Sequence, residues 1–232
     1  MFYYLQLKGR LPEPQVRFYA AQILLALEHL HGSNVIYRDL KPENILISKD
    51  GYLRLTDFGL SKESESRGAA TSTFCGTSEY LAPEMVLGKA YTECVDWWEF
   101  GILIYEMLIG HAPFRSQQLQ DLFQRIVNDP VVFPCATHPT PECMEIVQLL
   151  LAKDPAERLT NPNAIKQHAW FRGLNWDDLY LKRIAPPYVP HLANPEDISH
   201  FNSDWVNPSE KLADAPAVPD SENPFKDFTF VK

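Results

Sequence analysis

Residues 93–109 read ECVDWWEFGILIYEMLI, and the organisation of the whole chain can be worked out from this stretch. Apolar side chains would occupy nearly every face of a helix with this sequence. Such a helix must be buried on most of its sides, because it offers almost no polar face to water. We therefore expect it at the centre of a helical domain, with other helices packed around it.

Further helices are predicted on both sides of this stretch. Over residues 13–31, apolar side chains recur at helical spacing, with Pro12 and Pro14 at the start and Gly32 at the end. Three more helices are expected near residues 117–128, 141–152 and 162–171. Helices therefore dominate the prediction, and the sequence contains no internal repeat.

Short runs of β type lie between the first of these helices and the buried one. They read NVIY (34–37), NILIS (44–48) and YLRLT (52–56). Polar turns separate them, one of which contains Asp50 and Gly51. Residues 61–80 are rich in Ser, Thr, Gly and charge, which predicts a loop. The expected fold class is therefore mainly α with a small β insert.

The composition changes near residue 186. From there to the end, 8 of the 19 prolines fall within 47 residues, and aliphatic residues are few. A segment of this kind has too little apolar surface to fold alone, so we expect an extended tail. It closes on NPFKDFTFVK, where Phe225, Phe228 and Phe230 lie close together.

Charge and composition argue against several classes of partner. The chain has 232 residues, 45% of them hydrophobic, and its 21 basic and 30 acidic residues give a net charge of −9. This balance argues against binding to nucleic acid or an anionic membrane and is compatible with a basic peptide partner. Acidity for solubility alone is the alternative. We expect no transmembrane segment and no signal peptide.

The cysteines predict a reducing compartment. Cys75, Cys94, Cys135 and Cys143 show neither the spacing of a disulfide framework nor that of a zinc site. We expect reduced and mostly packed thiols in an intracellular protein of the cytoplasm, with the nucleus as a further compartment.

The stretch YRDLKPENILI, residues 37–47, sets charged and polar side chains between apolar runs. Asp39 and Asn44 fit the D-x-x-x-x-N of a protein-kinase catalytic loop, residues 57–59 read DFG, and residues 82–84 read APE. Taken singly, Asp39 could be a turn residue and Asn44 a helix cap. The three motifs in this order and at this spacing favour the catalytic interpretation over chance.

The chain resembles the C-terminal lobe and tail of an AGC-group serine/threonine protein kinase over nearly its whole length. The residues that carry the resemblance are Tyr37 before Arg38-Asp39, TFCGTSEYLAPE (73–84), VDWW (95–98), NWDDL (175–179) and the closing FKDFTF (225–230). They are similar to the serum/glucocorticoid-regulated kinases, protein kinase B and ribosomal kinases. The resemblance implies a kinase C-lobe portion over residues 1–171 and an AGC tail with a hydrophobic motif over residues 172–232.

The resemblance also implies ATP and Mg²⁺ as ligands and a role for each residue of the site. Asp39 would orient the acceptor hydroxyl as the base, and Lys41 would place positive charge beside the moving phosphate. Asn44 and Asp57 would hold magnesium, which prefers oxygen ligands. On the nucleotide side, Leu46 and Thr56 would complete the binding site. Lys41 alone reads as a solvated surface charge.

Basic Ser/Thr-containing proteins are the substrates that the resemblance implies. Glu43 and Glu106 would bind arginines that precede the acceptor, and Thr77 would lie beside the substrate. Glu106 stands in an apolar helix, where an unpaired carboxylate would be costly. An internal salt bridge is therefore the alternative for Glu106.

Phosphorylation by an upstream activating kinase is implied at three positions. A phosphate on Thr73 would pair with Arg38 and Lys62 and order the loop, although Thr73 could also be one hydroxyl among many in a Ser/Thr-rich loop. Thr229 resembles the hydrophobic-motif phosphosite, and Ser221 resembles the turn-motif site.

Four further residues are implied to be structural. Glu84 and Arg158 should form a buried ion pair that ties the activation segment to the domain. Asp96 should accept backbone donors from the catalytic loop. Gly59 completes the turn of the DFG motif.

The sequence departs from the family pattern in three places. We recognise no Gly-rich loop, no V-A-x-K lysine and no αC glutamate, so we expect a fragment whose activity alone is weak or absent. A non-catalytic kinase-like interaction module and a fragment that does not fold stably stay open as alternatives. Ser78 stands where Pro is usual, and Glu99-Phe100 stands where a small residue and Leu are usual.

Overall fold

The computed structural model describes residues 1–63, 70–135, 139–194 and 197–200. It contains two compact units, Met1–Leu192 and Ala193–Lys232. In the described residues, helices form most of the regular structure and the strands are short. The predicted fold class, mainly α with a small β insert, is confirmed.

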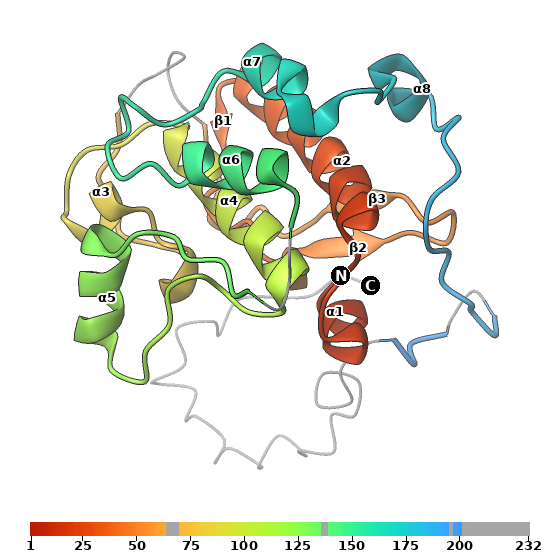
Figure 1. Cartoon of the computed structure of the whole chain (residues 1–232), viewed down its shortest axis with the longest axis horizontal. Helices are drawn as coiled ribbons and strands as arrows, with labels where there is room; N and C mark the ends of the chain where they lie inside the picture. The colour runs from red at the N-terminus through yellow and green to blue at the C-terminus, as the bar shows by residue number, and fades with distance from the viewer. Residues whose placement is uncertain (64–69, 136–138, 195–196, 201–232) are drawn as a thin grey trace, which may run out of the picture. The chain divides into compact units, whose positions relative to one another are not determined.

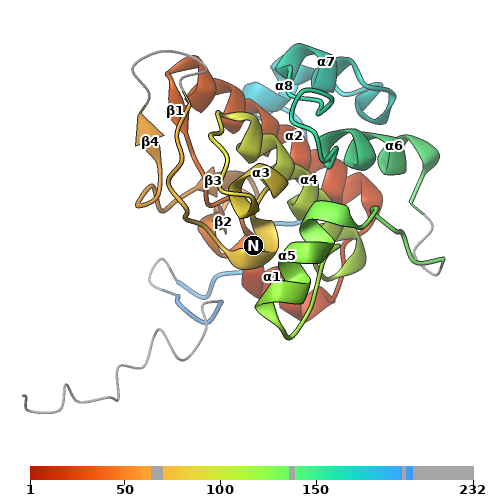
Figure 2. The same cartoon turned by 90° about the vertical axis from the view of Figure 1, so that its left-hand side faces the viewer.

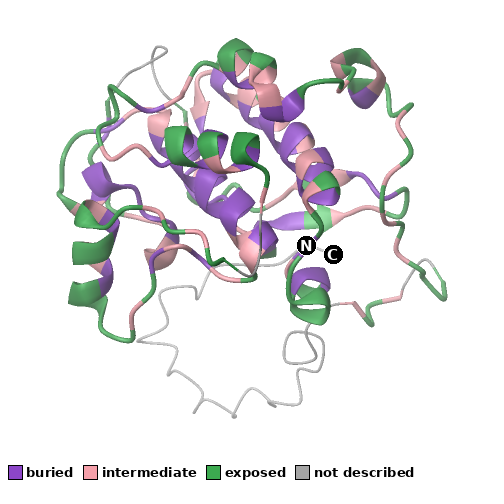
Figure 3. Ribbon diagram, in the orientation of Figure 1, coloured by how far each residue is buried: buried purple, intermediate pink, exposed green. Residues whose placement is uncertain are grey.

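Helix α4 (Cys94–Ile109) runs through the middle of the first unit, as residues 93–109 predicted (Figure 1). Nearly all of its side chains are buried (Figure 3). Helix α2 (Glu13–Gly32) packs along it, and helix α6 (Pro141–Leu150) crosses it. Both helices bury apolar faces against α4, so the hydrophobic effect holds the three together.

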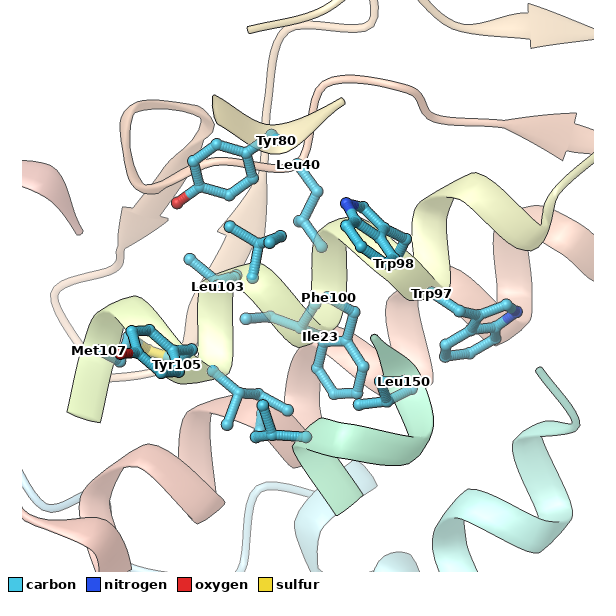
Figure 4. Close-up of a cluster of buried hydrophobic side chains, with 14 of the residues drawn as sticks. Ile23, Leu40, Tyr80, Trp97, Trp98, Phe100, Leu103, Tyr105, Met107 and Leu150 are labelled. Atoms are coloured by element: carbon cyan, nitrogen blue, oxygen red, sulfur yellow. The ribbon is translucent and has the colours of Figure 1, made fainter. Parts of the chain in front are cut away.

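The close approach of α6 to α4 depends on a glycine. A Cβ added to Gly101 would lie 2.9 Å from Leu150 Cβ, well inside the optimal separation of two carbon atoms. Phe100 lies beside Leu150 at this crossing, and Trp97 and Trp98 fill the next turn of α4 (Figure 4). The centre of the unit is therefore a tightly packed aromatic and aliphatic core.

The remaining helices are shorter. They are α1 (Phe2–Lys8), α3 (Pro83–Val86), α5 (Leu119–Asn128), α7 (Pro162–Gln167) and α8 (Trp176–Tyr180), with 3-10 turns over Pro42–Asn44, Ser78–Tyr80 and Ala169–Phe171. The helix predicted near residues 162–171 is interrupted at His168, whose backbone is extended and whose side chain accepts a hydrogen bond from the Trp170 N–H. One predicted helix is therefore two short elements.

The β insert consists of two separate antiparallel pairs (Figure 2). Strand β2 (Ile45–Ile47) pairs with β3 (Leu53–Leu55), as the sequence predicted. Strand β1 (Val35–Ile36) pairs with β4 (Lys62–Glu63), which lies in the stretch predicted as a loop. As a result, the segments that join the two pairs, residues 37–44 and 56–61, begin and end beside each other.

Part of the predicted tail belongs to the first unit. The ring of Tyr188 stacks on that of Tyr4, with centroids 4.1 Å apart, and the hydroxyl of Tyr52 donates a hydrogen bond to the carbonyl of Ile184. The compact unit therefore continues to Leu192, whereas the division after residue 171 that the sequence suggested stays a prediction.

The cysteines are unpaired in the structure. Cys143 is buried, Cys75 and Cys94 are half-buried, and Cys135 is exposed. Among the residues that the structure describes, none of the helices combines the length and the apolar character needed to cross a membrane.

Candidate active site

The carboxylate of Asp39 is the centre of the candidate site. It lies in the Asp39 loop (residues 37–44), between β1 and β2, and only 6% of its side chain is exposed. Asn44 Nδ2 donates to Asp39 Oδ2 over 2.7 Å, and Lys41 Nζ lies 2.8 Å from the same oxygen. The hydroxyl of Thr77 donates to Asp39 Oδ1 over 3.2 Å. One carboxylate thus gathers a cation, an amide and a hydroxyl.

Helix α4 supports this loop through Asp96. The carboxylate of Asp96 accepts hydrogen bonds from the backbone N–H groups of Tyr37 and Arg38, over 2.9 and 2.8 Å. The His31 Nε2 lies 2.6 Å from it. Arg38 has a φ of 67°, which is unusual for a residue with a side chain. Backbone of this kind concentrates at functional sites, where surrounding contacts hold it in place.

The β2–β3 hairpin brings Asp57 to the same region. The N–H and hydroxyl of Thr56 both donate to the carbonyl of Asn44, over 2.9 and 3.0 Å. Asp57 follows directly, with a φ of 55°, and its carboxylate accepts from the N–H of Gly59 over 3.1 Å. Leu46, on β2 in the same hairpin, is 37% exposed. The structure therefore places Asn44 and Asp57 on two adjoining turns, with Leu46 on the strand that follows Asn44.

The side chains of Asn44 and Asp57 suit a magnesium ion. Both hydrogens of the Asn44 amide go to Asp39, and its amide oxygen accepts no hydrogen bond from the described residues. In the described part of the chain, no three acidic, His or Cys side chains are grouped so that they could hold a metal ion by themselves. Mg²⁺ in phosphate sites usually takes one or two protein oxygens and completes its shell with water and phosphate. This donor set fits that pattern.

Without a phosphate on Thr73, Arg38 and Lys62 contact other groups of the loop that follows. Arg38 donates to the carbonyl of Leu60 and to the hydroxyl of Tyr91, and that hydroxyl donates to the carbonyl of Thr73. The ammonium of Lys62 lies 2.7 Å from the hydroxyl of Thr71, not that of Thr73. The Thr73 side chain is exposed. The geometry thus joins Arg38 to Thr73 through Tyr91 rather than directly.

A buried ion pair joins α3 to the rest of the unit. The guanidinium of Arg158 donates to both carboxylate oxygens of Glu84, over 2.6 and 2.8 Å. It also donates to the carbonyl of Cys94 over 3.1 Å. A bidentate pair with both partners buried fixes orientation as well as distance.

Glu106 has a hydroxyl partner instead of a basic one. It accepts a short hydrogen bond from Tyr80, and no Lys, Arg or His lies within salt-bridge distance of it among the described residues. Burial raises the pKa of Glu106, and repulsion from Glu43 and Glu79 raises it further. The internal salt bridge considered for Glu106 is therefore absent from the described structure. A cation next to this carboxyl would stabilise its ionised form.

The protein kinase domain family matches residues 1–171 of the chain. The chain belongs to the protein kinase family. The chain is 43% identical, over its full length, to a RAC family serine/threonine-protein kinase homolog of Dictyostelium discoideum, and it covers 52% of that protein. It is also 45% identical to the human serine/threonine-protein kinase Sgk2, with 89% of the chain and 56% of Sgk2 aligned.

A third relative extends the comparison to fungi. The chain is 40% identical over its full length to the serine/threonine-protein kinase SCH9 of Candida albicans and covers 31% of it. These relatives support the AGC group that the sequence motifs indicated. The chain spans about half the length of the first two relatives and less of the third.

Two predicted phosphosites of the tail, Ser221 and Thr229, lie outside the described residues. The structure adds instead two residues that the motifs did not single out as functional. Tyr91 bridges Arg38 and Thr73, and Glu99 accepts a hydrogen bond from the backbone of Leu40 over 2.9 Å. Glu99 carried a signal in the sequence, since it is a charged residue in an apolar helix, one turn from Asp96.

Proposed function

We propose that this kinase domain transfers the terminal phosphoryl group of ATP to serine or threonine hydroxyls of proteins. The arrangement around Asp39 carries the proposal, because a buried carboxylate with Lys41 at 2.8 Å and Asn44 at 2.7 Å is oriented before any substrate arrives. Phosphoryl transfer demands positioning and charge neutralisation more than covalent chemistry from the protein.

In the proposed reaction, a substrate oxygen forms a bond to the terminal phosphorus of ATP and the bond from that phosphorus to ADP breaks. Asp39 accepts a hydrogen bond from the attacking hydroxyl and takes its proton. Lys41 contacts both oxygens of Asp39, at 2.8 and 3.0 Å. From there it would place positive charge beside the moving phosphoryl group. Thr77 steadies the same carboxylate from the segment opposite.

Magnesium and nucleotide binding are assigned to the two adjoining turns. Asn44 and Asp57 would hold Mg²⁺, which would neutralise charge on the phosphates. Leu46 is exposed enough to contact an adenine ring. The hydroxyl of Thr56 is engaged with the Asn44 carbonyl, so its role is to hold the Asn44 end of the hairpin.

Basic residues near the acceptor are the proposed recognition feature of the substrates. The carboxyl of Glu106 is desolvated, repelled by Glu43 and Glu79, and without a cation within salt-bridge distance in the described structure. The positive charge of a substrate arginine would offset both the cost of burying the Glu106 carboxylate and its repulsion by the other two glutamates. Thr77, which contacts Asp39 and Lys41, would lie beside the acceptor residue of the substrate.

Regulation by an upstream kinase is proposed at Thr73. The guanidinium of Arg38 is buried, and within the described residues no carboxylate lies near enough for a salt bridge. A phosphate on Thr73 would supply the missing anion and draw the segment toward the Asp39 loop.

The proposal is tested by phosphate transfer from ATP to an Arg-x-Arg-x-x-Ser peptide. Asp39→Asn should lower kcat by about 10²–10⁴-fold, the range for loss of a general base. Asp121→Asn, an exposed acid on α5, is the matched control and should leave the rate unchanged. Transfer that persists in Asp39→Asn would refute Asp39 as the base, and binding of the peptide without any transfer would favour a non-catalytic module.

A further inference from the structure

We propose that Glu99 is a positioning residue of the candidate site, and that it holds the peptide group directly after Asp39 in place from helix α4. Its effect on phosphoryl transfer rests on the proposed function. Its effect on the backbone of the Asp39 loop does not, so the two can be tested separately.

The hydrogen bonds of Asp96 and Glu99 lie on either side of Asp39. The two acids are three residues apart on α4, so they share one face of the helix. Asp96 accepts the N–H groups of Tyr37 and Arg38, which precede Asp39. Glu99 Oε2 accepts the N–H of Leu40, which follows it, over 2.9 Å. The loop is therefore fastened to α4 both before and after Asp39.

The bond from Glu99 acts on a peptide group with a second function. The carbonyl of that same peptide group belongs to Asp39 and accepts a hydrogen bond from Asn44 Nδ2 over 2.8 Å. Glu99 and Asn44 therefore hold the two ends of one rigid plane. If the plane turned, the amide of Asn44 would lose one of its two bonds to Asp39. Through this plane, Glu99 sets the orientation of both Asp39 and Asn44.

The side chain of Leu40 does not provide the same restraint. It is buried and lies over α4 beside Trp98 (Figure 4). Packing of this kind is not directional, so it fixes the place of the residue more strongly than the rotation of its peptide group. The direction of the N–H is set by its acceptor.

The environment of Glu99 is unfavourable for a carboxyl group. The residue is 1% exposed, and its Oε1 has no hydrogen-bond partner among the described residues. Burial raises its pKa well above the usual value. The groups around it are mostly acidic. Asp96 and Asp39 repel its charge and Lys41 attracts it, while burial and, after it, the charge of Glu99 raise the pKa of the Tyr37 and Tyr80 hydroxyls.

An apolar residue would avoid this penalty, since a buried polar atom without a partner is costly. The hydrogen bond to Leu40 is what the structure gains from a carboxyl at this position. A neutral carboxyl still accepts through its carbonyl oxygen, so the bond does not require the charged form.

Amide hydrogen exchange at Leu40, followed by NMR, tests the positioning role directly. Glu99→Met fills a similar volume without an acceptor, whereas Glu99→Gln keeps one. We expect exchange at Leu40 to become about tenfold faster in Glu99→Met and to stay within twofold in Glu99→Gln, as for loss of one buried hydrogen bond. The amides of Tyr37 and Arg38, held by Asp96, are the internal control and should not change.

Three results would overturn the proposal. The first is an unchanged exchange rate of the Leu40 amide in Glu99→Met. The second is an equal acceleration of exchange at Leu40 and at the control amides. If Glu99→Met does not fold, Glu99→Asp withdraws the acceptor by one methylene and takes its place. The third result needs only the wild-type protein: a Leu40 amide that exchanges as fast as an exposed amide would contradict its hydrogen bond to Glu99.

Kinetics then test the consequence for transfer. Glu99→Met should lower kcat about tenfold while the KM for the peptide stays within twofold, and Glu99→Gln should restore kcat. Glu157→Gln, an exposed glutamate, is the control and should behave as wild type. A fall in thermal stability alone, with kcat intact, would show a merely structural role. If no variant or wild type transfers phosphate, the proposed function fails while the exchange result still stands or falls alone.

Discussion

Two buried arginines of this kinase domain lie in opposite electrostatic situations. Arg158 is 4% exposed and its guanidinium meets both oxygens of Glu84. Arg38 is 7% exposed, yet in the described structure its side chain donates only to a carbonyl and a tyrosine hydroxyl. Arg158 therefore has a permanent counterion. Arg38 has none in the described structure, and an added anion could supply it.

The difference separates structure from regulation. A buried charge pair that is always satisfied holds two elements in one arrangement, but it cannot report a signal. A buried cation whose partners are neutral gains much more from a new anion, because the interaction is weakly screened there. Arg38 also precedes Asp39 directly, so an anion bound to it acts next to the proposed base.

The largest expected effect comes from breaking the permanent pair. Glu84→Gln leaves the guanidinium of Arg158 buried without its counterion, which should lower the free energy of unfolding by about 3–5 kcal/mol. Urea denaturation of the variant and the wild type measures this change. The exposed Asp121→Asn serves again as the control. A loss below about 1 kcal/mol would mean that water or a neighbour replaces Glu84.

Giving Arg38 an anionic partner should have the next largest effect on stability. Phosphate on Thr73 should raise the free energy of unfolding by about 2 kcal/mol, because it adds charge-assisted hydrogen bonds to a buried guanidinium. Unfolding of the protein with and without phosphate on Thr73 gives the value.

Arg38→Met distinguishes this explanation from a general effect of the phosphate. The variant should lose the gain, whereas Lys62→Met, whose ammonium contacts Thr71, should lose only part of it. An equal gain in wild type and Arg38→Met would disprove the pairing.

The same contrast exists between two acids of α4. Asp96 accepts three hydrogen bonds, whereas Glu99 accepts one, and among the described residues Lys41 is the cation that attracts its charge. The pKa of Glu99 is raised in the folded protein, so the folded state keeps its proton where the unfolded chain has released it. Stability should therefore fall as pH rises above about 4.5 toward the folded pKa, by at most about 1.4 kcal/mol per pH unit.

Glu99→Gln should remove this slope, because an amide does not titrate in the range. The free energy of unfolding, measured by urea between about pH 5 and 8, should differ between the two proteins by an amount that grows with pH. Other groups titrate equally in both and cancel in the difference. A difference that stays constant with pH would show that Glu99 is ionised in the fold.

The sequence predicted the buried helix and the polar loops better than the contacts between them. Residues 93–109 are apolar around the whole helix, so their central position needed no knowledge of the partners. The break at His168 was missed because it depends on a local side-chain hydrogen bond to Trp170. Strand β4 was missed because it lies in a polar stretch and because its partner β1 is far from it in the sequence.

The site shows the same division between motif and contact. The Asp39 loop and the DFG turn were recognisable from residue order alone. The pairing of Lys62 with a phosphate on Thr73 stays a prediction. The contact of Lys62 with the hydroxyl of Thr71 was not predicted, because it accompanies the bridge between Thr71 and Tyr91, which joins residues 20 positions apart. The bond from Glu99 to Leu40 spans 59 positions, which no local pattern specifies.

Tyr91 should have the smallest effect, and it tests how the second arginine is held before any phosphate arrives. Its hydroxyl accepts from Arg38 and donates to the carbonyl of Thr73. Tyr91→Phe should lower the free energy of unfolding by about 1 kcal/mol, whereas Tyr180→Phe, which is 76% exposed, should have no effect. With phosphate on Thr73 the loss should shrink, because Arg38 then has a stronger partner. If the loss stays the same in both forms, Tyr91 supports the segment independently of Arg38, and the two buried arginines differ less in function than in geometry.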